Sequence, residues 1–244
     1  MKMEKILEIR ELCKSYPGFE LKDVSFCLEE GSIMGFVGRN GAGKSTTLRA
    51  ILNFVHPDSG EVRLFGKLFS QAEDEIRQKI GFASSGVDYY PRKTLKQILE
   101  NTRSFYPNWD AARCRELMER FGLAETKRFM DLSEGMKVKF HLVLALSHGA
   151  RLLILDEPTS GLDPVSREEL VVIFRQLAGQ GVSILFSTHI TSDLEKCADR
   201  VTYIQKGQIL ASENREDFLR HFAAQGSTLE EIMVNLEVNR EVQI

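Results

Sequence analysis

The chain has 244 residues, which is enough for one large domain or two small ones with a substantial hydrophobic core. Hydrophobic residues make up 43% and charged residues 27%, as in ordinary soluble globular proteins, and the net charge of −3 gives no basic excess that would indicate binding to nucleic acid or anionic lipid. The four cysteines lack the paired spacing of a zinc site, so we expect reduced thiols in a cytosolic protein rather than a disulfide framework.

Nothing in the sequence predicts a membrane span. Residues 1–12 mix charged and apolar side chains and lack the apolar core of a signal peptide. No apolar run approaches the ~20 residues that cross a bilayer. We therefore expect any transport pathway to be formed by other polypeptides.

The first part of the chain is predicted to form strands and then a helix. The pattern between residues 6 and 28 favours strands, because residues 24–29 alternate between apolar and polar side chains. Residues 33–37 predict a fully buried strand, and a glycine-rich loop follows it. We expect the next helix to carry its apolar face as far as Val55 and to end at residues 57–60.

The middle of the chain, residues 86–149, is predicted to be almost entirely helical. Thr94 with Gln97 forms a capping-box pattern at the start of one helix. Asp110 and Ser133 are expected to cap two further helices.

Strands and helices alternate again after residue 149. Residues 152–155 and 184–186 predict buried strands, and Ser166 with Glu169 is expected to cap the helix between them. Residues 200–210 predict a hairpin. This alternation implies an α/β fold with a largely parallel sheet covered on both faces, into which the helical middle is inserted.

A phosphate-binding pattern, G-x-x-x-x-G-K-[ST], follows the predicted strand at residues 33–37. The glycines let backbone N–H groups converge on phosphate oxygens, and the helix that follows adds its positive dipole end. We expect Lys44 to reach the β- and γ-phosphates of a nucleotide and the Ser45 hydroxyl to ligate Mg²⁺. The whole nucleotide-binding loop consists of Gly38, Arg39, Asn40, Gly41, Ala42, Gly43, Lys44, Ser45 and Thr46.

Two carboxylates follow the buried strand at residues 152–155. In NTPases with a phosphate-binding loop, an aspartate at this position holds the Mg²⁺ shell, which assigns Asp156 to the metal. The adjacent Glu157 is suited to polarise the attacking water. Because consecutive residues of an extended strand point to opposite sides, the pair divides these roles only if the strand ends there.

The order of these motifs resembles that of the ABC ATPase family, from about Ile6 to Leu210. Residues 132–136, LSEGM, are similar to the family signature LSGGQ. Residues 160–163 resemble its D-loop, and residues 187–189 its switch-histidine segment. Two stretches, PTSGLDPVSREEL and STHITSDLEKCADR, look like those of bacterial exporters of the bacitracin-resistance kind.

The resemblance implies further site residues and a fold. His189 joins Lys44 and Glu157 in catalysis, and Tyr16 stacks on adenine. The fold is a RecA-like P-loop NTPase core with an antiparallel N-terminal β subdomain and an inserted helical subdomain. The expected boundaries are 1–85 and 150–222 for the core with its β subdomain, 86–149 for the helical signature subdomain and 223–244 for a C-terminal tail. The nucleotide-binding set also gains Ser133, Gly135 and Asp163.

The resemblance also implies an ATP-binding, ATP-hydrolysing subunit of a transporter, with ATP and Mg²⁺ as cofactors. Two ATPase chains, identical or different, would face each other head to tail with two nucleotides between them. Separately encoded membrane subunits would hold the pair at the cytoplasmic face of the membrane. No nucleic-acid partner is expected.

Two motifs depart from the family pattern. Ser85 replaces the glutamine usual after the strand that begins at Ile80; it can ligate Mg²⁺ through water, but its shorter reach leaves the strength of coupling open. Glu134 and Met136 replace a glycine and a glutamine of the signature. A glutamate beside a triphosphate is unfavourable, so we expect Glu134 to face outward or to pair with a basic residue.

Other conspicuous residues receive plainer interpretations. The five aromatic residues between positions 89 and 109 are expected to pack in a core, with an exposed groove for a membrane partner as the alternative. Four histidines show no ligand spacing and are expected at the surface or at helix caps: His56, His141, His148 and His221.

Two other functions stay open. A non-transport ABC ATPase acting on ribosomes or DNA would usually carry two ATPase units or a long coiled coil, and this chain has one unit and no sustained heptads. A nucleotide-dependent regulator that does not hydrolyse ATP is favoured only by Ser85. The residues against it are Lys44, Asp156, Glu157 and His189.

Overall fold

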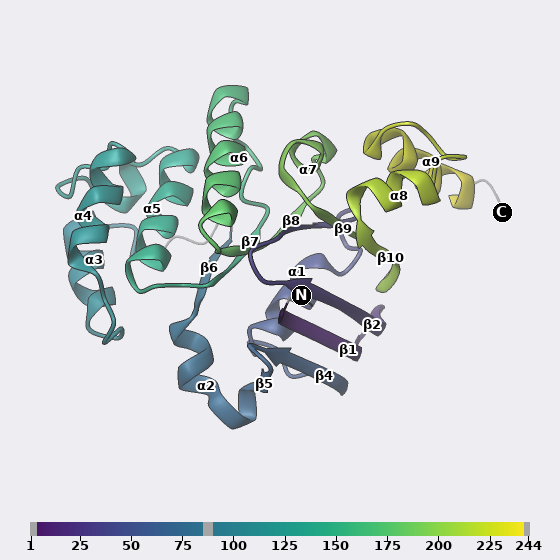
Figure 1. Cartoon of the computed structure of the whole chain (residues 1–244), viewed down its shortest axis with the longest axis horizontal. Helices are drawn as coiled ribbons and strands as arrows, with labels where there is room; N and C mark the ends of the chain where they lie inside the picture. The colour runs from purple at the N-terminus through teal and green to yellow at the C-terminus, as the bar shows by residue number, and fades with distance from the viewer. Residues whose placement is uncertain (1–3, 85–89, 242–244) are drawn as a thin grey trace.

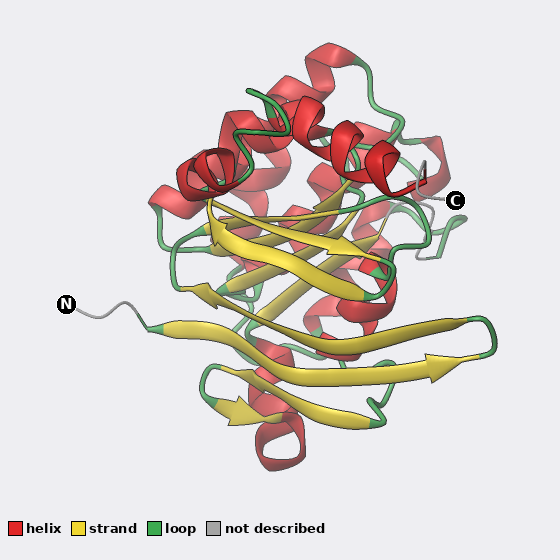
Figure 2. Ribbon diagram, turned by 90° about the vertical axis from the view of Figure 1, so that its right-hand side faces the viewer, coloured by secondary structure: helices red, strands yellow, loops and turns green. Residues whose placement is uncertain are grey.

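A computed structural model of the chain describes residues 4–84 and 90–241. None of the helices within these ranges combines the length and apolar character of a bilayer span. The chain forms two β-sheets with helices around them (Figures 1 and 2). The elements are β1 (Lys5–Tyr16), β2 (Phe19–Glu29), β3 (Ile33–Val37), α1 (Lys44–Ile51), β4 (Ser59–Leu64), β5 (Lys67–Leu68), α2 (Phe69–Gln78), β6 (Ile80–Ser84), α3 (Leu95–Arg103), α4 (Ala111–Arg120), η1 (Phe129–Asp131), α5 (Glu134–Ser147), β7 (Leu152–Asp156), α6 (Pro164–Gly179), β8 (Ser183–Thr188), α7 (Thr191–Cys197), β9 (Arg200–Gln205), β10 (Gln208–Asn214), α8 (Arg215–His221) and α9 (Leu229–Glu241).

The larger sheet has the strand order β10-β9-β3-β8-β7-β6. Strands β9, β3, β8, β7 and β6 are parallel, and β10 pairs antiparallel to β9 at one edge. The carboxyl ends of parallel strands meet at one edge of a sheet, where α/β proteins bind their ligands. The phosphate-binding loop after β3, the carboxylates after β7 and the histidine after β8 therefore lie at the same edge.

The smaller sheet is antiparallel, with the order β2-β1-β4-β5. It packs beneath the larger sheet with α1 near their junction (Figures 1 and 2). Apolar side chains of both sheets and of α1 form one continuous core, which includes Leu48, Ile51, Leu152 and Ile154. The helix that follows the phosphate-binding loop is therefore fixed from both sides.

The opposite face of the larger sheet is covered by helices α6 to α9 (Figure 1). Successive residues of β7 divide between the two faces: Leu152 and Ile154 join the core beneath, whereas Leu153 and Leu155 join the core under these helices. This burial on both faces explains why the strand is a continuous apolar run.

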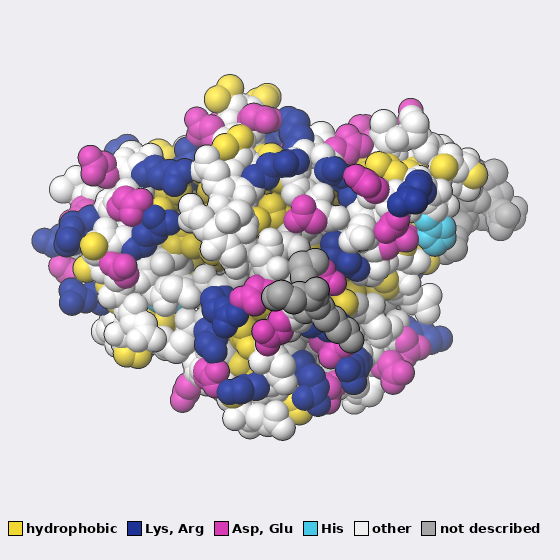
Figure 3. Space-filling model, viewed as in Figure 1, with side chains coloured by type: hydrophobic (Ala, Val, Ile, Leu, Met, Phe, Trp, Pro, Cys, Tyr) yellow, Lys and Arg dark blue, Asp and Glu magenta, His cyan; other side chains and the backbone are white. Residues whose placement is uncertain are grey.

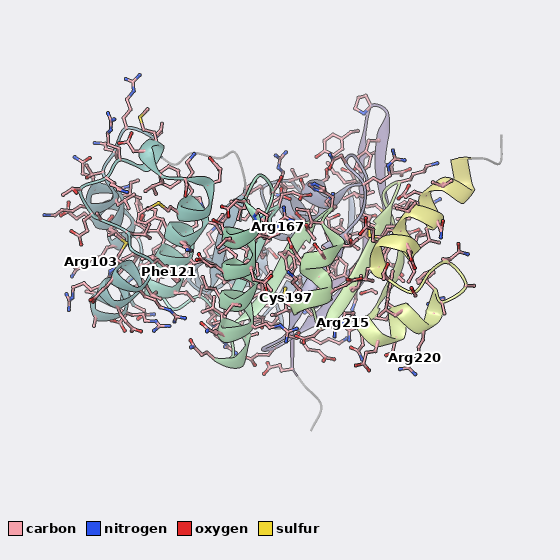
Figure 4. The ribbon with its side chains drawn as sticks, turned by 90° about the horizontal axis from the view of Figure 1, so that it is seen from above. Arg103, Phe121, Arg167, Cys197, Arg215 and Arg220 are labelled. Carbon is pink, nitrogen blue, oxygen red and sulfur yellow. The ribbon has the colours of Figure 1, made fainter. Side chains whose placement is uncertain are left out.

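Helices α3, α4, η1 and α5 form a lobe beside the larger sheet with a small core of its own. Phe121, labelled in Figure 4, packs against both this core and the core under α6. Nearby, Arg120 donates a hydrogen bond to Gln176 on α6. The lobe is thus joined to the sheet by apolar and polar contacts together.

The expected fold class and several helix starts are confirmed. The larger sheet is largely parallel, the N-terminal sheet is antiparallel, and the described part of the middle segment is helical. Thr94 Oγ1 accepts a hydrogen bond from Gln97 N at 3.3 Å while Gln97 Oε1 accepts one from Thr94 N at 3.1 Å. Asp110 and Ser133 cap α4 and α5.

Two local expectations were wrong, and three elements were missed. The cap of α6 is Asp163, and Ser166 lies within the first turn. Helix α1 ends at Ile51 and not at residues 57–60, because β4 already begins at Ser59. The sequence pattern also gave no indication of β4, β5 and α2.

Candidate functional site

The phosphate-binding loop joins β3 to α1 in a backbone conformation that only glycine permits at two positions. A Cβ atom on Gly38 would lie 2.3 Å from the carbonyl oxygen of Ile204. Gly43 has a φ of +115°, and a Cβ atom there would lie 2.7 Å from Leu21. The loop therefore curls against β9 and β2, and a cavity of about 280 Å³ opens beside it. Residues lining this cavity are Phe19, Arg39, Asn40, Gly41, Gly43, Lys44, Ser45, Thr46 and Glu157.

Lys44 is the buried cation of this cavity, with a side chain only 5% exposed, whereas Arg39 is 58% exposed. Its Nζ donates hydrogen bonds to the carbonyl oxygens of Gly38 at 2.7 Å and Arg39 at 3.3 Å. It also lies 3.3 Å from Glu157 Oε1. The charge is therefore held inside the curl of the loop, where a phosphate group would meet it.

The two expected carboxylates follow one another at the end of β7 but face different surroundings. Asp156 is buried, and its Oδ1 accepts a hydrogen bond from Ser187 Oγ at 2.5 Å. Glu157 has left the strand and has a φ of +53°. Its carboxylate reaches Lys44 on one side and His189 on the other, with Oε2 2.8 Å from His189 Nδ1. Since the strand ends between them, the pair can divide two roles.

A magnesium ion fits the oxygen donors of this region. Ser45 lines the cavity next to Lys44, and Asp156 is the last residue of β7. No three His, Cys, Asp or Glu side chains in the described ranges are placed to hold a metal by themselves. Sparse protein ligation suits Mg²⁺, which keeps waters and takes substrate phosphate oxygens. Ser85, the third expected ligand, lies outside the described residues.

The signature segment lies apart from the cavity, because none of its residues lines it. Ser133 caps α5 and accepts a hydrogen bond from Met136 N at 3.3 Å. A Cβ atom on Gly135 would lie 3.4 Å from Ser166 Cβ, so the signature packs against the start of α6. Glu134 is exposed and forms an ion pair with Lys137 at 2.9 Å, which confirms the expectation for this glutamate.

Asp163 and Tyr16 also lie outside the lining of the cavity in the single chain. Asp163 caps α6 through hydrogen bonds from the Val165 and Ser166 backbone at 3.0 and 3.1 Å. The Ser166 hydroxyl and backbone hydrogen bonds hold the pKa of the Asp163 carboxyl below its ordinary value. Tyr16 is 42% exposed at the end of β1, with Lys14 Nζ 5.7 Å from its ring centre.

Sequence reasoning missed two residues of this region. Phe19, at the start of β2, lines the cavity and packs against Gly43. Its closeness to Tyr16 in a turn was the available signal. Ser187 is hydrogen-bonded to the Asp156 carboxylate and to the backbone N–H of Glu157. From the sequence it was placed in the switch-histidine segment but was given no role.

An apolar groove of about 290 Å³ separates the helical lobe from the edge of the larger sheet. Phe54 and Tyr90 line it and are 55% and 57% exposed. His148, also in the groove, stacks on Tyr106 with ring centres 3.9 Å apart. The other lining residues are Leu52, Phe69, Arg77, Ile80, Gly81, Phe82, Ile98, Thr102, His141, Leu144 and Ala145.

The expected environments of the aromatic and histidine residues are therefore corrected in part. Tyr90 and Phe105 are exposed, whereas Tyr106 is half-buried against His148; Tyr89 lies outside the described residues. His141 is 7% exposed within α5, so the surface or cap position expected for it was wrong; His148 is 5% exposed but is the C-cap of α5, which is one of the two positions expected for it. His141 lies within α5 and His148 directly after it, and α5 packs on α4 and β6.

Comparison with known proteins agrees with this architecture. The model of the ABC transporter family matches residues 21–160. The ABC transporter ATP-binding protein YtrB of Bacillus subtilis is 34% identical over 84% of this chain and 70% of its own length. The bacitracin transport ATP-binding protein BcrA of Bacillus licheniformis is 35% identical over 85% of this chain and 69% of its own. A solved ATP-binding subunit of an ABC transporter superposes with a TM-score of 0.85 at 28% identity, covering 95% of this chain and 99% of that one. The chain belongs to the ABC transporter family as one of its ATP-binding subunits.

Proposed function

We propose that this subunit binds ATP with Mg²⁺ in the cavity beside Lys44, hydrolyses it with Glu157 as general base, and powers export through separate membrane subunits. The observation that carries the proposal is one line of contacts: Lys44 Nζ lies 3.3 Å from Glu157 Oε1, and Glu157 Oε2 lies 2.8 Å from His189 Nδ1. A cation for phosphate, a carboxylate for water and a histidine therefore adjoin a cavity of nucleotide-phosphate size. The likeness to bacitracin-transport ATPases supports export as the direction.

The contacts of Glu157 suggest how the site changes when ATP binds. The γ-phosphate offers Lys44 a stronger anionic partner than Glu157, so the lysine turns to it. Glu157 then keeps its contact with His189 and has one oxygen available to accept a proton from water. Ser45 and Asp156 would hold Mg²⁺, which when bound neutralises phosphate charge. His189, 46% exposed at the surface of the chain, would hold the other oxygen of this carboxylate in place.

A second chain is part of this proposal. Ser133 lies at the N-terminus of α5, where backbone N–H groups and the helix dipole attract anions. Ser133 does not line the cavity of its own chain, so we propose that it contacts the nucleotide bound to a second chain. Asp163 and Tyr16, which also lie outside the cavity lining, would complete the site when two chains close on ATP. The partner is a second ATPase subunit of this kind, identical or different.

The groove between the helical lobe and the larger sheet is proposed to receive the membrane subunit. It lies beside β6, whose carboxyl end is at the nucleotide edge, and beside α5, which begins at the signature. A segment held there contacts both parts that ATP would move relative to each other. Exposed aromatic side chains such as Phe54 and Tyr90 are the type that anchors interfaces. This docking would place the subunit at the cytoplasmic face of the membrane.

The experiment that tests the proposed chemistry replaces Glu157 with glutamine. Glu157→Gln keeps the size and the hydrogen-bonding geometry but removes the base, so phosphate release should fall roughly 10²-fold or more. Binding of a fluorescent ATP analogue should persist, and light scattering should show an ATP-bound dimer. Glu169→Gln, on an exposed glutamate paired with Lys139, is the control and should turn over normally. Normal turnover by Glu157→Gln would overturn the assignment of the base.

A further inference from the structure

The hydroxyl of Ser187 joins the two carboxylate residues after β7. Ser187 is completely buried on β8, directly opposite Asp156 in the parallel register. Its Oγ donates to Asp156 Oδ1 at 2.5 Å and accepts a hydrogen bond from Glu157 N at 2.9 Å. One hydroxyl therefore acts on the side chain of the expected metal ligand and on the backbone of the expected base. A hydroxyl that donates and accepts at once strengthens both hydrogen bonds.

The backbone of Glu157 needs such support. Its φ of +53° lies in the left-handed region, which is unfavourable for a residue with a long side chain. Residues in this region persist when the surrounding structure fixes them, and they cluster at active sites. The Glu157 amide receives a second contact from the Ser187 carbonyl oxygen at 3.2 Å, which any residue at position 187 would keep. The hydroxyl is the part of this support that depends on the side chain.

We infer that Ser187 is a positioning residue for ATP hydrolysis, whose hydroxyl fixes the turn at Glu157 and the orientation of Asp156 together. The inference rests on the roles proposed for Asp156 and Glu157. His189 and Lys44 hold the carboxylate end of Glu157, and Ser187 holds its backbone end. Without the hydroxyl, the carboxylate would sample positions away from the attacking water. A misplacement of about 1 Å costs on the order of 10²-fold in rate.

The same strand contains a control. Ser183, at the opposite end of β8, is also completely buried, and its Oγ accepts a hydrogen bond from Gly31 N at 2.8 Å. Replacing either serine with alanine therefore removes a buried hydroxyl and leaves a backbone N–H without this partner. Only position 187 adjoins the carboxylates, so the comparison separates positioning from simple loss of a buried hydrogen bond.

The test measures kcat, the KM for ATP, nucleotide affinity and melting temperature for four variants of the full chain. Ser187→Ala and Ser187→Val should lower kcat about 10- to 100-fold while nucleotide affinity stays close to that of the wild type. Ser187→Thr, which matches valine in size but keeps the hydroxyl, should recover most of the lost kcat. Ser183→Ala should lower the melting temperature as Ser187→Ala does and keep wild-type kcat.

Two results would overturn the inference. One is a kcat of Ser187→Ala equal to that of the wild type or of Ser183→Ala. The other is a threonine variant as impaired as the valine variant. If the larger side chains prevent folding, the two alanine variants still decide the question. Glu157→Gln, assayed in parallel, distinguishes failure of the proposed function from failure of this inference. Normal turnover by Glu157→Gln would refute the proposed base. Lost turnover by Glu157→Gln together with normal turnover by Ser187→Ala would refute only the role of Ser187.

Discussion

Glu157 owes its position to residues from two distant parts of the chain. Lys44 is at the start of α1, whereas Ser187 lies within β8 and His189 directly follows β8. None of these contacts is local in sequence. The residue types are those that phosphate binding and water activation require, but their distances follow from the order of β3, β8 and β7 in the sheet.

His148 combines the cap position expected for it with deep burial. It is the C-cap of α5, is 5% exposed, stacks on Tyr106 and has its Nδ1 3.1 Å from the carbonyl oxygen of Gln78. Burial lowers the pKa of His148 below its ordinary 6.5, because the charged ring would lose its hydration. It thus joins the helical lobe to the end of α2 in its neutral form.

The pH dependence of stability should reflect this buried histidine. A lowered pKa means that the unfolded chain binds the proton more readily, so the stability is complete above pH 6.5 and is lost as the pH falls toward the lowered value. His148→Phe keeps the ring stacking and removes the titration. Its melting temperature should therefore change less between about pH 7.5 and pH 5.5 than that of the wild type. His56→Phe, at an exposed position, is the control, and an unchanged pH dependence in His148→Phe would refute the prediction.

At the scale of elements, the groove lies between two hydrophobic cores, that of the helical lobe and that beneath the larger sheet. Helices α3 and α5 belong partly to the lobe, whereas β6 and the end of α1 belong to the sheet. Phe121 and Leu146 pack against both the core of the lobe and the core under α6, so apolar contacts join the lobe to the rest of the chain. A groove at such a joint is suited to a partner that must respond to movement.

The docking prediction concerns the exposed rim of this groove. Phe54→Glu and Tyr90→Glu change side chains that are already more than half exposed, so the subunit should fold and bind ATP. Co-purification with the membrane subunits should fall about tenfold or more. An aromatic side chain that the membrane subunit would bury is lost, and a charge is introduced in its place. Val172→Glu is the control, since Val172 is 45% exposed on α6 and does not line the groove. If both rim variants co-purify normally, the groove is not the docking site.

At the scale of the whole molecule, acidic and basic side chains are interspersed over the face shown in Figure 3. This distribution and the net charge of −3 give no support to a nucleic-acid partner on that face.

The C-terminal segment, proposed above as a tail that begins at residue 223, contains a helix that packs on the rest of the chain. Helix α9 packs on α7, and Tyr203 Oη donates a hydrogen bond to Glu237 at 2.6 Å. The C-terminal segment thus contacts β9, whose Ile204 packs against Gly38 of the phosphate-binding loop.

A site shared between two chains can be tested by mixing two defective variants. Lys44→Ala should bind ATP poorly, and Ser133→Arg should place bulk and charge where the opposite γ-phosphate would dock. Each homodimer should therefore be inactive. A mixed dimer has one intact phosphate-binding loop facing one intact signature, so random pairing should restore roughly a quarter of wild-type turnover. Persistent inactivity in mixtures shown to contain mixed dimers would refute the shared site.

Local sequence signals determined the parts of this protein that depend on neighbouring residues. The strand–loop–helix around Lys44 is contiguous, and its glycines and apolar strand were sufficient to predict its shape. The caps at Thr94, Asp110 and Ser133 were predicted for the same reason, since each acts within one helical turn. The ordered motifs then identified the family.

Tertiary structure decided what depends on residues far apart in the chain. The start of α6 was instead a local miss: Asp163 and not Ser166 is its cap, because proline at the first helical position places the start three residues earlier. The burial of His148 required the stacking of α5 beside β6, which no local pattern contains. The hydrogen bonds of Ser187 arise from the register of β7 with β8, residues 31 positions apart. Residue types thus specified the chemistry in sequence, whereas strand order and packing fixed the distances at which it operates.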